Sequence, residues 1–120
     1  MARILIVDDS KTSRRFLKNM LEGSGHEIVA EALNGQEGVE LYEEYKPDLV
    51  TMDISMPVMD GIQATKEIIE KDPDAKIIMV SAAAQKSNMI EALKRGALDF
   101  IEKPFDADVI INCIDKIMND

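Results

Sequence analysis

The sequence predicts an α/β domain built on a parallel β-sheet. Five short apolar runs alternate with five stretches in which apolar residues recur at helical spacing, and this alternation is typical of successive βα units. Most of the runs are almost continuously apolar, as expected for strands that are buried on both faces. Four of the runs also end at polar residues, and open α/β sheets bind ligands at the C-terminal ends of their strands.

The first half of the chain predicts three strands and two helices. The strand at residues 4–7 leads to a helix from about 11 to 22, and the strand at 27–33 mixes polar with apolar residues, which indicates a sheet edge. The next helix follows Asn34, which can form a reciprocal cap with Glu37 before the strand at 49–52. The first helix has one apolar face, formed by Phe16, Leu17, Met20 and Leu21.

The second half predicts two more strands and three helices. A loop after Asp53 leads to a helix that Asp60 and Gln63 can cap in the same reciprocal way. The strand at 77–80 precedes a helix that carries Met89, Ile90 and Leu93 and ends at Gly96. A strand at 99–102 precedes the last helix, whose expected buried stripe consists of Val109, Ile110, Cys113, Ile114 and Ile117.

The composition fits one globular domain over residues 1–120, and we expect no linker, repeat or output domain. The net charge of −9 should repel phosphate backbones and anionic lipid, so neither nucleic acid nor a membrane is an expected partner. Cys113 is the single cysteine, which excludes an intrachain disulfide and fits a reducing compartment. No apolar stretch has the length of a signal peptide or a membrane span, so we expect a cytoplasmic protein.

Three aspartates follow two of the predicted strands, with Asp8 and Asp9 after the first and Asp53 after the third. If these strands are neighbours, about 4.8 Å apart, ionised carboxylates there repel by on the order of 3 kcal/mol per pair. The cluster needs a cation, and Mg²⁺ is the expected one because it prefers oxygen ligands and keeps several waters. The structural alternative is that a strand-end aspartate such as Asp9 only begins the following helix.

The other strand ends supply groups that suit a phosphoryl group. Ser81 offers a hydroxyl donor after the fourth strand, and Lys103 offers a compact positive charge after the fifth. Transfer of a phosphoryl group to a carboxylate forms an acyl phosphate, and its catalysis depends mostly on positioning and on charge neutralisation. Asp53 is the expected nucleophile. The structural alternatives are a turn residue for Ser81 and a salt-bridge partner for Lys103.

These strand ends carry motifs in a specific order, which is Asp8-Asp9, Met52-Asp53, Met56-Pro57, Asp60-Gly61, Val80-Ser81-Ala82 and Lys103-Pro104-Phe105. In this order and spacing the chain resembles the response-regulator receiver family over essentially its full length, and within that family the single-domain CheY-like chemotaxis regulators. The resemblance implies a flavodoxin-like, doubly wound (βα)5 fold with helices on both faces. It also implies a five-stranded parallel sheet of order 2-1-3-4-5, for which CheY is itself a standard example.

The resemblance implies a role in two-component phosphotransfer. Asp53 would accept a phosphoryl group from a CheA-like histidine kinase, and Lys103 and Ser81 would contact that group. The chain would not be an enzyme beyond catalysing its own phosphotransfer and autodephosphorylation. Mg²⁺ would be bound by the carboxylates of Asp8, Asp9 and Asp53 and by the backbone carbonyl of Ser55.

The resemblance also implies a switch formed by Ser81 and Phe100, in which the hydroxyl shifts toward the phosphoryl group and the aromatic ring turns inward behind it. This change would alter the affinity for a downstream motor, adaptor or phosphatase protein, with the chain itself a monomer. A cis peptide bond between Lys103 and Pro104 is implied as well. Ser55 and Ala83 occupy the positions at which family members vary and which set the dephosphorylation rate.

Several alternatives remain open at this point. A phosphorelay intermediate, or a single-domain regulator outside chemotaxis, would use the same residues. A haloacid-dehalogenase-like phosphatase also uses a strand-end aspartate with Mg²⁺, but in an Asp-x-Asp pattern, whereas Asp8 and Asp9 are adjacent. A nucleotide- or flavin-binding module is disfavoured because no G-x-x-x-x-G-K-[ST] loop is present. A solvated face and a docking surface for an acidic partner are both compatible with the basic cluster Lys11, Arg14, Arg15 and Lys18.

Overall fold

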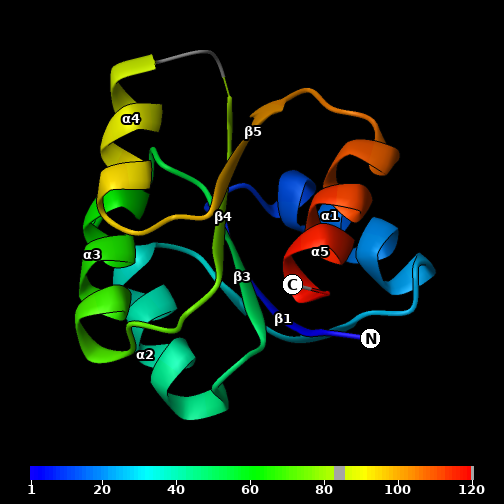
Figure 1. Ribbon diagram of the computed structural model, residues 1–120, viewed down its shortest axis with the longest axis horizontal. Helices are drawn as coiled ribbons and strands as arrows, with labels where there is room; N and C mark the ends of the chain where they lie inside the picture. The colour runs from blue at the N-terminus through cyan, green and yellow to red at the C-terminus, as the bar shows by residue number, and fades with distance from the viewer. Residues whose placement is uncertain (83–85, 120) are drawn as a thin grey trace.

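Strands and helices alternate along the whole chain in a computed structural model, which describes residues 1–82 and 86–119 (Figure 1). Ala83 lies outside the described residues. The strands are β1 (Arg3–Val7), β2 (Glu27–Ala32), β3 (Leu49–Met52), β4 (Ile77–Ala82) and β5 (Asp99–Lys103). The helices are α1 (Lys11–Gly23), α2 (Gly35–Tyr45), α3 (Gly61–Lys71), α4 (Lys86–Lys94) and α5 (Ala107–Met118).

The five strands form one parallel sheet of order β2-β1-β3-β4-β5, which confirms the expected flavodoxin-like arrangement. The mixed strand β2 lies at an edge of the sheet, as its composition predicts. Helices α1 and α5 cover one face of the sheet, and α2, α3 and α4 cover the other (Figure 1). None of the described helices is long and apolar enough to cross a membrane.

Each central strand contributes to two hydrophobic clusters, one on either face of the sheet. In β1, Leu5 and Val7 pack on the side of α2 to α4, whereas Ile4 and Ile6 pack on the side of α1 and α5. All four side chains are at most 1% exposed. The apolar runs are continuous because successive side chains of a strand point to opposite faces and both faces are covered.

Part of the burial predicted for the helices is wrong. Leu17 and Leu21 of α1 are buried, but Phe16 is 53% exposed, and in α5 Val109 is 50% exposed. Ile90 and Leu93 of α4 are also exposed. These residues lie at the margins of the apolar stripes, where the surface of the helix faces solvent rather than the sheet. Helical spacing alone therefore overestimates the width of each buried face.

Three of the described helices begin with a side-chain cap. Ser10 caps α1 and accepts a hydrogen bond from the backbone N–H of Ser13 at 3.2 Å. Asn34 accepts from the N–H of Glu37 at 2.9 Å, as predicted, and the Glu37 carboxylate in return accepts from the N–H of Leu33 at 2.9 Å rather than from Asn34 itself. Asp60 caps α3, but the predicted reciprocal bond from Gln63 is wrong, because that side chain donates to the carboxylate of Glu67 instead.

Candidate metal and phosphoryl-transfer site

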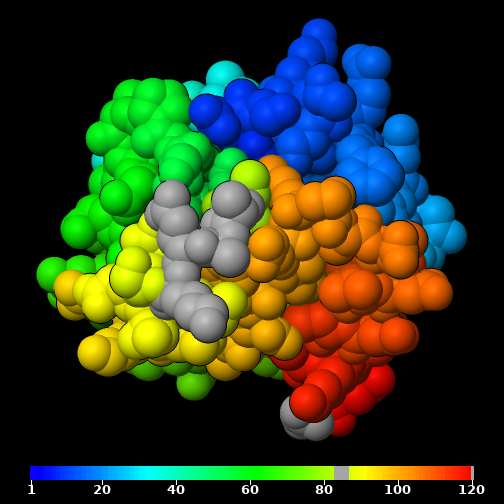
Figure 2. All heavy atoms as spheres, turned by 90° about the horizontal axis from the view of Figure 1, so that it is seen from above, coloured from blue at the N-terminus to red at the C-terminus, as the bar shows by residue number. Residues whose placement is uncertain are grey.

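The polar strand ends meet at the C-terminal edge of the sheet. Val7 pairs with Met52 in the β1–β3 register, so Asp8 and Asp53, the next residue of each strand, emerge side by side. Ala82 pairs with Lys103 in the β4–β5 register, which brings the lysine to the same edge as Ser81. Figure 2 looks down on this edge, where blue, green, yellow-green and orange segments of the chain converge.

The three aspartates form a compact acidic cluster. Asp8, Asp9 and Asp53 each offer a carboxylate oxygen, and these atoms lie within 4.8 Å of one another. Asp8 is 1% exposed and Asp53 is 9% exposed, whereas Asp9 faces solvent. A set of hard oxygen donors at this spacing suits a divalent cation such as Mg²⁺, which retains several of its waters on the open side.

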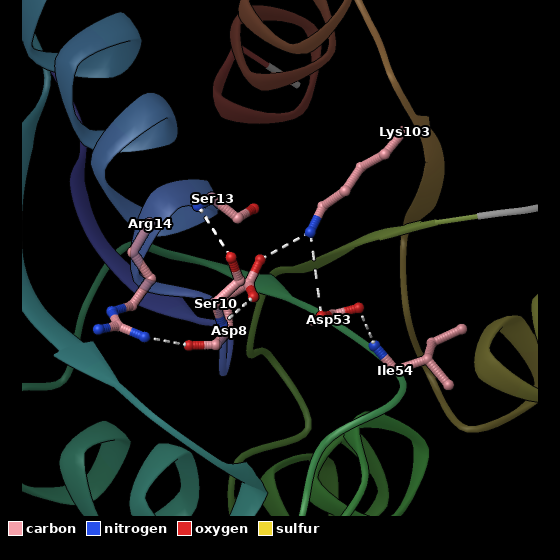
Figure 3. A network of polar contacts seen from close by, with 7 residues as sticks. All are labelled: Asp8, Ser10, Ser13, Arg14, Asp53, Ile54 and Lys103. Carbon is pink, nitrogen blue, oxygen red and sulfur yellow. Dashed lines mark hydrogen bonds and ion pairs between the residues drawn. The ribbon is translucent and has the colours of Figure 1, made fainter.

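Lys103 reaches into the cluster from the end of β5. Its Nζ atom lies 2.8 Å from Oδ2 of Asp8 and 3.9 Å from Oδ2 of Asp53 (Figure 3). The salt bridge considered as a structural alternative is therefore present, and it is shorter to Asp8 than to Asp53. The peptide bond between Lys103 and Pro104 is cis, as the family resemblance implies.

The surroundings of Asp53 disfavour the ionised form of its carboxyl group. Burial raises its pKa above the ordinary value, the Lys103 ammonium opposes that rise, and the Asp8 carboxylate adds to it. Hydrogen bonds from the Ser81 side chain and the Ile54 N–H also lower the pKa, but the balance is a raised value. The Ile54 N–H donates to Oδ1 at 2.8 Å. A bound cation would stabilise the ionised carboxylate and so lower this pKa.

Gly61 allows α3 to begin against the backbone of the site. A Cβ atom added to Gly61 would lie 1.8 Å from the backbone oxygen of Asp53 and 2.8 Å from its carbonyl carbon. No side chain fits there without displacing the main chain that carries the aspartate. The Asp60-Gly61 motif marks this position in the sequence, but only the structure gives the reason for it.

Asp8 is anchored through several of its polar atoms. Its Oδ1 atom accepts from the Ser10 N–H at 2.9 Å, and its backbone N–H donates to the carbonyl of Ala32 at 3.0 Å. Its backbone carbonyl accepts from Nη1 of Arg14 at 2.7 Å (Figure 3). The sequence gives no local signal for this contact, because Arg14 falls within the basic cluster of the first helix.

The roles of the remaining predicted residues stay predictions. Ser81 is 6% exposed at the end of β4. Phe100 of β5 is partly buried against the cluster on the side of α2 to α4. It also lines a surface pocket with Pro104, Phe105 and other residues of that segment. Ser55 lies exposed in the loop between β3 and α3.

Comparisons with known proteins match nearly the full length of the chain. Residues 4–115 match the family described as response regulator receiver domain. The chemotaxis protein CheY of Bacillus subtilis (strain 168) is 55% identical over 117 residues, which cover 98% of each chain. The chemotaxis protein CheY of Thermotoga maritima is 51% identical over 115 residues, which cover 96% of each chain.

Solved structures give the same result. The CheX-CheY-BeF3-Mg+2 complex from Borrelia burgdorferi contains a chain with a TM-score of 0.93 and 35% identity to this one, over 97% of this chain and 88% of that one. The response regulator domain of Thermotoga maritima CheB has a TM-score of 0.85 at 39% identity, over 98% of this chain and 93% of that one. This chain therefore belongs to the response regulator receiver domain family, and it is a CheY-like receiver.

Proposed function

We propose that this receiver is phosphorylated on Asp53 by a CheA-like histidine kinase and that the modification controls its affinity for a downstream protein. The observation that carries the proposal is the nearly buried Asp53 carboxyl, which lies among two further carboxylates and the Lys103 ammonium. The output is binding rather than turnover of a metabolite, so the chain acts as an enzyme only in its own phosphotransfer and autodephosphorylation.

The donor set supports Mg²⁺ as the cofactor. Asp8, Asp9 and Asp53 would hold the ion together with the backbone carbonyl of Ser55. The three carboxylates lie close together and Lys103 offsets only part of their charge, which favours binding of a divalent cation. When bound, Mg²⁺ neutralises charge on the oxygens of the transferring group.

The residues of the chain divide the work of transfer. An oxygen of the Asp53 carboxylate attacks the phosphorus of the donor's phosphohistidine, a P–O bond forms and the P–N bond breaks. The bonding electrons pass to the imidazole nitrogen of the donor, which takes a proton from solvent. The Lys103 ammonium, already between two carboxylates, pairs with a phosphoryl oxygen, and the Ser81 hydroxyl donates to another.

The proposed switch is formed by Ser81 and Phe100 and depends on where they lie in the sheet. Ser81 lies on β4 beside β5, and Phe100 lies on β5 in register with Met79 of β4. If the hydroxyl moves toward the phosphoryl group, the space behind it opens and Phe100 turns inward, which alters the surface around β5. Phosphorylation thus biases an equilibrium between two arrangements of this face.

Chemotaxis is the favoured pathway because several relatives at 50–55% identity are chemotaxis proteins. The expected partners are the kinase and a motor, adaptor or phosphatase protein, and one relative is solved with CheX. A phosphorelay intermediate, or a regulator outside chemotaxis, is the second candidate function, since a structurally similar chain is a two-component regulator of the LuxR family. Cytoplasmic location and a monomeric state stay predictions.

The test is labelling of the full chain with acetyl phosphate and Mg²⁺, followed by mass spectrometry of the intact protein. Wild type and an exposed control, Asp74→Asn, should gain one phosphoryl group, whereas Asp53→Asn should gain none. Chelation of Mg²⁺ should abolish labelling. Labelling of Asp53→Asn that maps to Asp8 would point to dehalogenase-like chemistry, and failure of the wild type to label would refute the proposal.

A further inference from the structure

We propose that Arg14 is a positioning residue for the metal site, which it serves without touching the cation. The inference rests on the proposed function, since it assigns the residue to the Mg²⁺ site of that function. The guanidinium of Arg14 would fix the main chain between Asp8 and Asp9, so that both carboxylates face the same point.

The side chain of Arg14 joins three elements of the fold. From the first turns of α1, its Nη1 atom donates to the backbone carbonyl of Asp8 at 2.7 Å, just beyond β1. Its Nε atom lies 3.4 Å from Oε1 of Glu31 on β2. The Arg14 side chain is only 12% exposed, so solvent competes little for these contacts. The planar fork of an arginine can satisfy both directions at once, as a lysine cannot.

The position of Asp9 depends on this contact more than that of Asp8 does. Asp8 is also held through its carboxylate by Ser10 and Lys103. Asp9 lies between β1 and α1 and is exposed. The carbonyl of Asp8 and the nitrogen of Asp9 share one planar peptide unit. Arg14 therefore fixes the plane from which the Asp9 side chain projects toward the cluster.

A positioning role and a purely electrostatic role predict opposite results. Arg14 carries the same sign of charge as Mg²⁺, so if it acted only through its charge, its removal would strengthen Mg²⁺ binding. If it holds the Asp8–Asp9 peptide, its removal weakens binding, because a metal ligand loses its orientation. The direction of the change in affinity separates the two roles.

The experiment is an Mg²⁺ titration of the full chain, monitored by two-dimensional NMR of the backbone amides. Arg14→Ala should weaken Mg²⁺ binding about tenfold, at the lower end of the effect expected for groups that orient metal ligands. The matched control is Arg15→Ala, which removes the same charge from the neighbouring, exposed position of α1. It should leave the affinity unchanged or strengthen it by no more than about twofold.

Two further variants separate local positioning from loss of the fold. Arg14→Lys keeps the charge but loses the fork and should show an intermediate affinity, and it carries the test if Arg14→Ala does not fold. Glu31→Gln removes the ion pair but leaves the donor to the Asp8 carbonyl, so it should bind Mg²⁺ nearly as tightly as wild type. Urea unfolding without metal checks the stability of each variant.

The possible outcomes distinguish this inference from the function on which it rests. Equal or tighter Mg²⁺ binding by folded Arg14→Ala and Arg14→Lys, relative to Arg15→Ala, would overturn the positioning role and leave the proposed function intact. If wild type itself bound no Mg²⁺, both would be overturned together. Weaker binding confined to the Arg14 variants, with altered amide signals of Asp9 and Ser10, would support the proposal.

Discussion

The charge of Asp53 should destabilise the metal-free fold, and Asp53→Asn should therefore be more stable than wild type. At an effective dielectric of 20, a carboxylate no more than 4.8 Å away repels Asp53 by at least about 3.5 kcal/mol. Lys103 at 3.9 Å attracts it by about 4.3 kcal/mol. The attraction of the lysine and the repulsion from Asp8 nearly cancel, while Asp9 adds a share that solvent screens.

Burial then decides whether the charge of Asp53 stabilises or destabilises the fold. Removing a carboxylate from water costs several kcal/mol, and hydrogen bonds from Ile54 and Ser81 recover only part of it. An asparagine keeps an oxygen that can accept those bonds but carries no charge. We expect Asp53→Asn to raise the free energy of unfolding by on the order of 1–2 kcal/mol in the absence of divalent cations.

The assay is urea unfolding followed by circular dichroism, at neutral pH, with chelator and then with excess Mg²⁺. Bound Mg²⁺ stabilises the fold by mass action, and the asparagine variant lacks one of the metal ligands. Excess Mg²⁺ should therefore reduce or reverse the difference in free energy of unfolding between the variant and wild type. Folding raises the pKa of Asp53, so the folded wild type binds more protons than the unfolded chain. The stability of wild type relative to the variant should therefore increase as the pH falls through that raised pKa.

A metal-free Asp53→Asn variant that is less stable than wild type at neutral pH would refute this reasoning, because the carboxylate would then be fully compensated by its neighbours. An exposed aspartate provides the control. Asp74→Asn should change the free energy of unfolding by no more than about 0.5 kcal/mol, with or without Mg²⁺.

Three further substitutions test other contacts of the fold and the site by urea unfolding. Lys103→Ala leaves the buried carboxylate of Asp8 unpaired and should cost about 3 kcal/mol without metal, with partial recovery in Mg²⁺; a loss that Mg²⁺ did not reduce would count against the shared site. Tyr42→Phe removes the 2.7 Å bond to Asp72, which ties α2 to the end of α3, and should cost about 1 kcal/mol. Gly61→Ala should cost more than about 3 kcal/mol, because its Cβ meets backbone, whereas Gly23→Ala, with open space around it, should cost nothing or stabilise the helix. Equal behaviour of the two glycine variants would contradict the close approach at the site.

Local sequence patterns were sufficient for the order and type of the secondary-structure elements. The number of βα units and the edge location of β2 follow from the periodicity and polarity of each segment. The full strand order came only from the family resemblance, because the pairing of distant strands leaves no trace in local periodicity. Burial at the margins of helices was overestimated, as the exposure of Phe16 and Val109 illustrates, since it depends on how each helix leans on the sheet.

By itself the sequence determined which groups reach the functional edge of the sheet. An aspartate, serine or lysine at the end of a buried strand emerges there in any parallel sheet that contains these strands. Only the tertiary structure decided which groups meet: Lys103 lies nearer to Asp8 than to Asp53, and Arg14 holds a carbonyl rather than facing solvent. These contacts join separate elements at distances of a few ångströms, and such distances are set by strand register and helix packing, which no local pattern encodes.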